Sequence, residues 1–414
     1  MSFGDRGSSL LYSSKRSRHE NAWMLLILTA ALVFRLIVLF TEGDLMFLGT
    51  DDDNYRESAE ILLDSGVLTY GGWKEPTVFI MPGYPILLAG IFYLVGSTSW
   101  LAVRLFQVLL SLTQVWFGAR LGFYLGGRST GLLTAAFLAF YPPNLTAPCF
   151  LLTEVTFTCA LLAALLSFLK AEETGRVKWF ALTGLALGLA TYFRPTSGLL
   201  PVVFTGYFLI RRYPLKKILY GTLIMGIVVA TCLSPWITRN YKLYREFIPF
   251  TVSGGNPFLR GTYINGEINE KFPWVKGDRS LSDRAQMEYG KKRIVEGFRT
   301  DFRGYLYWYT VGKFTDLWAT PYYYKELTYL PAQQVNWVHR IFLGAGLGGL
   351  VIGLWRRKRA ALLFLSIIAY FTFVHLVYLS GPRYSYPVVQ LVIIFGAYFL
   401  AATAGTVGRL LLKR

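Results

Sequence analysis

Long apolar runs constrain this chain more than any other feature of its sequence. Most extend for about 17 to 25 residues, and a helix of about 20 apolar residues matches the hydrocarbon core of a bilayer. Inside lipid the backbone has to satisfy its own hydrogen bonds, so runs of this kind are expected to be helical. Candidate spans lie at about 23–41, 99–125, 130–143, 147–170, 177–193, 195–211, 215–237, 335–355, 360–379 and 384–405.

The low charge content supports a membrane protein. Only 16% of the residues are charged, whereas soluble domains carry about 25%. We therefore predict an all-α polytopic membrane protein with about ten transmembrane helices, forming a single unit over residues 23–414. The net charge of +18 does not indicate a nucleic-acid partner here, because many basic residues lie in short loops between spans, where they fix orientation.

The basic loops predict which face of the membrane each segment occupies. Positive charge concentrates on the cytoplasmic side, which places the tail 1–22 and both termini there. Two long outer loops result, at about 42–98 and 238–334. The apolar stretch 80–96 does not cross in this arrangement; it lies along, or dips into, the outer face. The basic clusters used are Arg120/Arg128, Lys170/Arg176/Lys178, Arg211/Arg212/Lys216/Lys217, Arg356–Arg359 and Arg409/Lys413/Arg414.

Three consecutive carboxylates, Asp51, Asp52 and Asp53, directly follow the first span. They open a stretch, 50–64, that reads as an amphipathic helix with juxtamembrane placement. One acid is explained by capping of this helix. Three acids beside a membrane surface repel one another, which tends to raise their pKa values and suits general-base catalysis.

Glu154 is a second candidate, because it lies a few residues into the predicted span 147–170. An ionisable group within a span is costly and indicates function by default. The alternative is a snorkelling or salt-bridged structural acid. The cysteines and histidines form no metal-binding spacing, although carboxylates could hold a hard cation.

Several arginines lie at the predicted outer boundary, against the orientation rule. A phosphate-bearing lipid would explain them, since Arg makes bidentate contacts to phosphate oxygens. For each one singly, snorkelling is the competing explanation. The residues are Arg35, Arg104, Arg194, Arg239 and Arg383.

These residues together resemble the GT-C glycosyltransferases, particularly family 39, which includes protein O-mannosyltransferases and the lipid A aminoarabinose transferase. Each motif is weak alone, but the ordered set covers nearly the whole chain. The matching pieces are Gly-Thr-Asp-Asp-Asp-Asn-Tyr at 49–55, Pro-Gly-Tyr-Pro-Ile-Leu-Leu-Ala at 82–89, Thr153-Glu154, Gly-Leu-Ala-Thr-Tyr-Phe-Arg-Pro at 188–195, Pro-Trp-Ile-Thr-Arg-Asn-Tyr at 235–241, and Arg383-Tyr384 with Pro387.

The resemblance implies an inverting glycosyltransferase that moves a sugar from a polyprenyl-phosphate donor to an acceptor hydroxyl on the outer face of the cell membrane. It makes Asp51 the base and Asp52 its neighbour, and Glu154 joins them as a predicted catalytic residue. No cofactor is required on this view, although a divalent cation is possible. The residues predicted to bind the lipid phosphate or the sugar are Arg383, Tyr384, Arg194, Arg239, Tyr55, Tyr84 and Arg35.

The chain also departs from these relatives. Met81 stands where the aminoarabinose transferase has a lysine, and Gly83 replaces the second of its paired prolines. The phosphate contact of that lysine therefore does not carry over. The chain shows no large soluble domain after its last span, which favours a lipid or cell-envelope glycan acceptor over a protein.

Two other classes of function remain open from the residues alone. A flippase or transporter of polyprenyl-linked glycans would also carry ionisable groups, but near the span centres and often with inverted repeats. A glycan polymerase or ligase of another membrane family would use outer arginines and a long outer loop. It would not call for three aspartates after the first span.

Overall fold

The computed structural model describes residues 18–73, 75–275 and 278–411, and side chains up to residue 406. Within that part of the chain there is no β-strand apart from one isolated bridge, so the predicted all-α fold is confirmed. Of the predicted cytoplasmic tail, residues 1–17 lie outside the described residues. Helices are found at all ten predicted spans: α1 (Arg18–Glu42), α4 (Trp100–Gly126), α5 (Arg128–Phe140), α7 (Glu154–Thr174), α8 (Val177–Phe193), α9 (Leu200–Ile210), α10 (Leu215–Tyr244), α15 (Ala332–Trp355), α16 (Arg359–Val377) and α17 (Pro382–Leu411).

Seven of these helices are long and apolar enough to cross a membrane by themselves. The other three, α5, α8 and α9, are shorter; α9 follows the 3₁₀ turn η3 (Pro195–Leu199). The chain is thus a multi-pass membrane protein. The count of ten spans stays a prediction.

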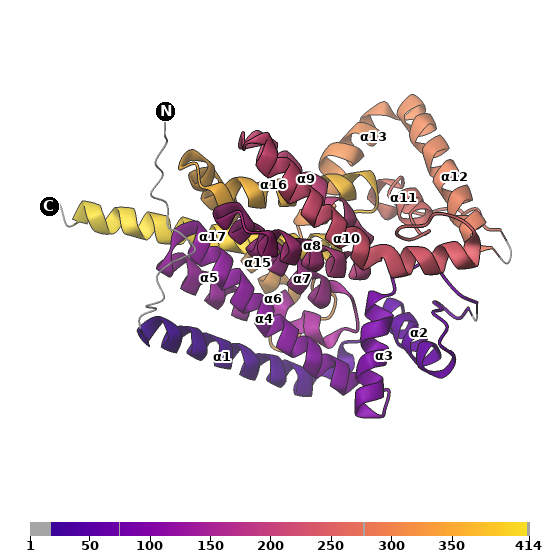
Figure 1. Cartoon of the computed structure of the whole chain (residues 1–414), viewed down its shortest axis with the longest axis horizontal. Helices are drawn as coiled ribbons and strands as arrows, with labels where there is room; N and C mark the ends of the chain where they lie inside the picture. The colour runs from indigo at the N-terminus through magenta and orange to yellow at the C-terminus, as the bar shows by residue number, and fades with distance from the viewer. Residues whose placement is uncertain (1–17, 74, 276–277, 412–414) are drawn as a thin grey trace.

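The spans form one bundle around α17 and α7 (Figure 1). Helix α17 packs against α15, α5 and α4, and α7 packs against α8 and α4. Close approach depends on small residues: a Cβ at Gly349 of α15 would lie 1.9 Å from the Phe395 carbonyl oxygen of α17. Helices that rely on backbone contact of this kind are typical of membrane bundles, where lipid gives no hydrophobic drive.

The end of the predicted span 130–143 and the start of the predicted span 147–170 lie at other residues in the structure. Helix α5 ends at Phe140, and the chain continues through α6 (Pro142–Thr146) and the turn η2 (Ala147–Cys149) before α7 begins at Glu154. The reason is local, because Tyr141 precedes Pro142 and takes the extended conformation that a following proline imposes. Glu154 is therefore the first residue of its helix, and does not lie a few residues into it.

The predicted first outer loop corresponds to residues 43–99 between α1 and α4, which we call the first outer segment. It contains the turn η1 (Gly43–Leu45), α2 (Asp51–Ser65) and α3 (Gly83–Val95). The side of the membrane that it faces stays a prediction. Helix α2 confirms the helix expected at 50–64. At 13 residues, α3 is only about 20 Å long, too short to cross a core of about 30 Å. It packs against α2, and its tip exposes Tyr93 and Leu94.

The second outer segment, residues 245–331 between α10 and α15, begins later than predicted because α10 continues to Tyr244, with Pro235 inside it. It contains α11 (Gly255–Arg260), η4 (Ile264–Gly266), α12 (Arg279–Thr300), α13 (Phe302–Tyr307), the π turn η5 (Trp308–Gly312) and α14 (Lys313–Trp318). Helix α12, with 22 residues, is the longest of these.

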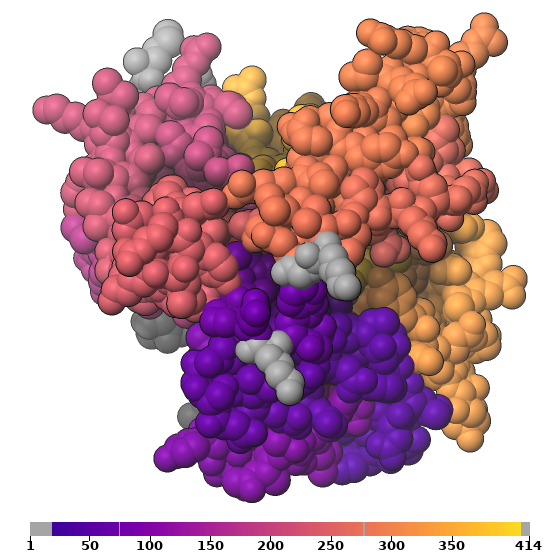
Figure 2. All heavy atoms as spheres, turned by 90° about the vertical axis from the view of Figure 1, so that its right-hand side faces the viewer, coloured from indigo at the N-terminus to yellow at the C-terminus, as the bar shows by residue number. Residues whose placement is uncertain are grey.

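Both outer segments gather at one end of the bundle, whereas α1 begins and α17 ends at the opposite end (Figure 1). Figure 2 looks directly onto the outer segments, with the first, in indigo and purple, below the second, in red and orange. The side chains described next come together at this end.

Candidate active site

Four charged side chains from distant parts of the sequence meet where the outer segments join the bundle. Arg383 lies between two carboxylates: its Nη1 donates to Asp51 Oδ2 at 2.6 Å, and its Nε donates to Glu154 Oε1. The Nη2 of Arg194 donates to the same Glu154 oxygen at 2.5 Å. We call Asp51, Glu154, Arg194 and Arg383 the charge cluster. The structure thus brings together four of the residues that the sequence singled out.

Each member of the charge cluster lies at a helix end. Asp51 and Glu154 are the first residues of α2 and α7, where the helix dipole favours a carboxylate. Arg194 directly follows α8 and takes an extended conformation before Pro195. Arg383 is in the first turn of α17, after Gly381. Helix termini therefore hold all four backbone positions.

Burial differs sharply within the charge cluster. The Glu154 side chain is 1% exposed, and its Oε2 has no hydrogen-bond partner. Arg194 and Arg383 are 13% and 17% exposed, whereas Asp51 is 39% exposed. Two cations balance two anions, as a buried ionic group requires. Asp51 is the member that an incoming molecule can reach most easily.

The pKa of Asp51 lies below its ordinary value. Burial alone would raise that pKa, but the Arg383 guanidinium and the Tyr70 hydroxyl, which donates to Asp51 Oδ1 at 2.9 Å, together lower it. The carboxylate is consequently ionised at neutral pH, the form in which it can accept a proton.

The neighbouring acids are placed differently. Asp52 is buried, and its two oxygens accept from the backbone amides of Leu48 and Thr50 at 2.7 and 2.9 Å. It closes the turn that leads into α2, which is a structural role, while no side chain caps the N-terminus of this helix. Asp53 is exposed on the same helix.

The predicted tyrosines pack near the charge cluster, and Tyr84 is fully buried there. The Tyr55 ring contacts Tyr70 and Tyr84 at centroid distances of 5.4 and 5.1 Å. The Tyr384 ring lies beneath the Arg194 guanidinium, at 5.9 Å, and stacks on His375. Sequence reasoning missed Tyr70, because the loop that carries it shows no periodic pattern.

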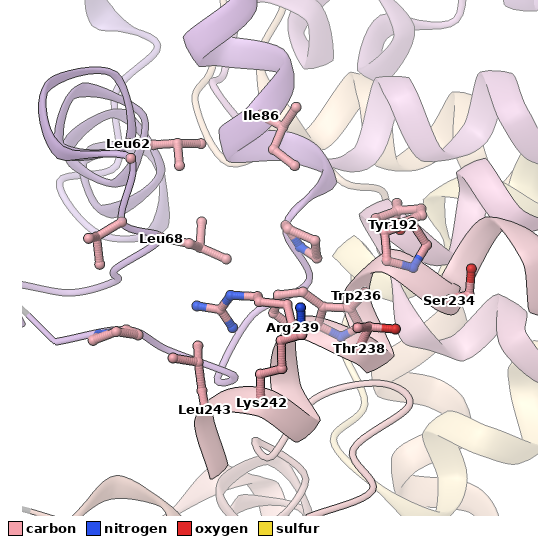
Figure 3. Close-up of a pocket in the computed structure, with 15 residues that line it drawn as sticks. Leu62, Leu68, Ile86, Tyr192, Ser234, Trp236, Thr238, Arg239, Lys242 and Leu243 are labelled. Carbon is pink, nitrogen blue, oxygen red and sulfur yellow. The ribbon is translucent and has the colours of Figure 1, made fainter. Parts of the chain in front are cut away.

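Arg239 lies apart from the charge cluster, in an open cavity of about 790 Å³ between α2, α3 and α10 (Figure 3). Its Nη1 donates to the Thr77 carbonyl and to Asn240 Oδ1, both at 2.9 Å, while its Nη2 is buried without a partner. Lys242 stands beside it, one helical turn further along α10. Sequence reasoning missed Lys242. The apolar lining includes Leu62, Leu68, Pro82, Ile86, Pro235 and Trp236.

Arg35 and Arg104 have structural partners instead of a shared site. Arg35 is fully buried between α1, α4 and α5, where it donates to Ser111 Oγ at 2.8 Å and to the Ala139 carbonyl at 2.9 Å. It thereby satisfies a carbonyl at the end of α5 that lacks a helical partner. Arg104 donates to the Cys149 carbonyl at 2.8 Å. The structure does not bring Arg35 to the other predicted substrate-binding residues.

The described residues contain no group of three His, Cys, Asp or Glu side chains arranged to hold a metal ion. Asp51 and Glu154 each contact the Arg383 guanidinium. The expectation that no cofactor is required stays a prediction.

Known proteins share this fold. Residues 74–238 match the model of the family described as dolichyl-phosphate-mannose-protein mannosyltransferase. The oligosaccharyltransferase of Archaeoglobus fulgidus, in its apo form, is 13% identical with a TM-score of 0.61, over 96% of this chain and 52% of that one. ArnT from Cupriavidus metallidurans, also apo, is 19% identical with a TM-score of 0.56, over 92% of this chain and 60% of that one.

A third structure, of the archaeal oligosaccharyltransferase AglB from A. fulgidus, contains an inhibitory peptide and a dolichol-phosphate; it is 12% identical with a TM-score of 0.60, over 95% of this chain and 52% of that one. No curated protein sequence matches the chain. The chain spans between half and three fifths of the length of these solved relatives. Together with the ordered motifs, these likenesses confirm the predicted resemblance: the chain has the fold of the GT-C superfamily of membrane glycosyltransferases.

Proposed function

We propose that this protein is an inverting glycosyltransferase that moves a sugar from a polyprenyl-phosphate donor to a hydroxyl of a lipid or cell-envelope glycan on the outer membrane face. The observation that carries the proposal is the Asp51 carboxylate. It is kept ionised, is partly open to solvent, and contacts an arginine that is suited to a phosphate. The GT-C fold supplies the context but, at this level of identity, does not fix the reaction.

The charge cluster can serve both halves of the transfer. An acceptor hydroxyl loses its proton to Asp51 and attacks the anomeric carbon, and the bond from that carbon to the phosphate oxygen breaks on the opposite face. Arg383 and Arg194 stabilise the charge of the departing phosphate. When Arg383 turns toward the phosphate, Asp51 loses its counter-charge, so its pKa rises as it becomes the base.

The cavity beside Arg239 suits the lipid part of the donor. It combines an apolar lining with two cations, Arg239 and Lys242, and no acid is among the residues that line it. The two cations would attract the anionic donor as it enters, before its phosphate reaches Arg383 and Arg194. The dolichol-phosphate in a protein of the same fold supports this assignment.

A second cavity, of about 300 Å³, suits a saccharide acceptor. It lies between the two outer segments and joins aromatic rings to carboxylates, including Trp73, Phe79, Glu75 and Glu246. Pro76 lines both cavities, so residues around it separate the donor side from the acceptor side. The Phe79 ring stacks on Tyr70, which donates to Asp51.

The test uses purified protein in nanodiscs with a panel of polyprenyl-phosphate sugars and a mixture of lipid and saccharide acceptors. The readout is sugar-dependent release of polyprenyl phosphate, with and without EDTA. We expect release by the wild type, loss in Asp51→Asn, and retention in Asp53→Asn, which makes the same charge change at an exposed position of α2. If donors cross the bilayer uncleaved when the protein is reconstituted in sealed proteoliposomes, with Asp51→Asn equal to wild type, the protein is a flippase instead.

A further inference from the structure

The segment that presents Arg383 is held by side chains of the second outer segment. Residues 378–381 connect α16 to α17 without helical structure, and Arg383 follows directly. A guanidinium that bridges two carboxylates needs its backbone fixed within a fraction of an ångström. The contacts that fix it come mainly from α14 and its surroundings.

The side chain of Lys313, the first residue of α14, binds to the C-terminal end of α16. Its side chain is fully buried, and its Nζ donates to the carbonyls of Leu376 and Tyr378 at 2.9 and 2.7 Å. These belong to the last turn of α16, where carbonyls lack helical partners and a cation is favoured. The Tyr309 ring lies 4.2 Å from Nζ. Burial lowers the pKa of Lys313 to about 7, with Asp316 acting in the opposite direction.

Asp316 holds the other end of the same segment. The Ser380 hydroxyl donates to Asp316 Oδ2 at 2.5 Å. Lys313 and Asp316 are three residues apart on α14, so they share one face of that helix. One helix face therefore fixes both ends of the stretch 376–380, three residues before Arg383.

The packing around Lys313 leaves no room for a side chain at position 261. A Cβ at Gly261, just after α11, would lie 2.2 Å from the Tyr378 carbonyl oxygen and 3.0 Å from the Lys313 Nζ. The Gly261 carbonyl in turn accepts from the Trp308 indole at 3.0 Å. Three parts of the second outer segment, around Lys313, Gly261 and Trp308, thus pack together beside the residues that precede Arg383.

The same outer segment also supports Asp51. Arg279, the first residue of α12, donates to the Tyr70 and Gly71 carbonyls at 2.6 and 3.1 Å, and the Tyr70 hydroxyl donates to Asp51. Both partners of the Asp51–Arg383 pair are therefore held from residues 245–331. The distance between the Asp51 carboxylate and the Arg383 guanidinium therefore depends on the position of the second outer segment.

We infer that Lys313 and Asp316 are positioning residues for Arg383: they hold residues 376–380 so that its guanidinium lies between Asp51 and Glu154. The inference rests on the proposed function for its catalytic consequence, but the geometry it describes is measurable without turnover. Neither residue touches the charge cluster, so each acts through the backbone.

The test compares wild type with Lys313→Met, Asp316→Ala, Ser380→Ala and Ser380→Thr in nanodiscs. Ser380→Thr keeps a hydroxyl that can donate to Asp316, so it should restore the hydrogen exchange and the kcat that Ser380→Ala changes. Lys291→Met is the control, because Lys291 pairs with Glu288 on the exposed face of α12 in the same outer segment. Two quantities are measured: amide hydrogen exchange of the peptide 376–384, and kcat and KM for the donor that the wild type cleaves.

We expect faster exchange in 376–384 and a kcat reduced about 10- to 100-fold, the cost of a small misplacement, with donor KM within about twofold because donor contacts are retained. Unchanged exchange in Asp316→Ala and Ser380→Ala, or an equal change in Lys291→Met, would overturn the inference. So would a failure of Ser380→Thr to rescue. If the wild type cleaves no donor, the proposed function fails, while the exchange measurements still decide the positioning role. If Lys313→Met does not fold, the two Ser380 variants carry the test.

Discussion

Neutralising Glu154 tests the balance of charge in the buried cluster. Glu154→Gln keeps the shape of the side chain but leaves Arg194 and Arg383 with only the partly exposed Asp51 as an anionic partner. Breaking a buried ion pair from one side costs about 3–5 kcal/mol, because an uncompensated charge remains. The Glu154 side chain is only 1% exposed, so we expect a destabilisation near that range.

A second substitution separates charge balance from loss of a contact. In the double variant Glu154→Gln/Arg194→Met, one cation again faces one anion. We expect stability to return to within about 1 kcal/mol of wild type, so the favourable coupling between the two changes is at least about 2–4 kcal/mol, and larger by whatever Arg194→Met costs alone. Activity should not return, since Arg194 is one of the groups assigned to the leaving phosphate.

The assay is SDS-induced unfolding in mixed micelles, followed by tryptophan fluorescence, with turnover measured in parallel. Glu246→Gln is the control, because it removes the same charge from an exposed pair with Arg284, in which both side chains are more than half exposed. Exposed pairs contribute about 0–1 kcal/mol. The reasoning is refuted if Glu154→Gln costs no more than this control, or if the double variant is as unstable as the sum of the two single variants.

Three further predictions follow from the site. Arg239→Gln should raise the donor KM about tenfold, the effect of about 1.4 kcal/mol, with kcat little changed; steady-state kinetics at fixed acceptor would show a wrong assignment as an unchanged KM. Because the pKa of Asp51 is lowered, this general base should stay ionised, and its stabilising ion pair intact, until the pH falls below the ordinary aspartate pKa near 3.8. Arg383→Gln should raise the pKa of Asp51, so the acid limb of kcat/KM plotted against pH should shift to higher pH in any residual activity. An unshifted limb would exclude Asp51 as the base. Gly83→Ala should destabilise the protein by about 1–3 kcal/mol in the same unfolding assay, because the new Cβ would lie 2.5 Å from a carbonyl oxygen at the end of α8; a neutral result would mean that α3 is not seated on α8.

Much of the fold could be read from the sequence because the bilayer imposes one length and one type of element on apolar segments. Helices occur at every predicted span, while the side of the membrane that the basic loops indicate for each segment stays a prediction. Element ends were less predictable. The prolines after Tyr141 move the start of α7 to Glu154, whereas Pro235 does not end α10. A proline inside a membrane helix is tolerated when neighbours satisfy the freed backbone groups, and neighbours are invisible in a sequence.

The candidate site was predictable in part for a similar reason. Asp51, Glu154, Arg194 and Arg383 stood out because charge at a membrane boundary is costly and needs a reason. Tyr70 and Lys242 did not stand out, since one is a tyrosine in an irregular loop and the other a lysine beyond the expected span end. Arg35 misled for the opposite reason: its charge is satisfied by backbone carbonyls that only the folded bundle places near it.

The order in which the cluster forms during synthesis follows from its sequence separations. Asp51 precedes Arg383 by 332 residues, and Glu154 precedes it by 229, whereas Arg194 follows Glu154 by only 40. The insertion machinery therefore handles both acids long before their shared counter-ion has been translated. A nascent chain is neutral at this place only once α17 has been threaded among the earlier helices. Insertion of the last helix thus completes both the bundle and the charge neutrality of the site. A finished molecule and an arrested one therefore differ in net charge at this site, and membrane quality control can recognise that difference.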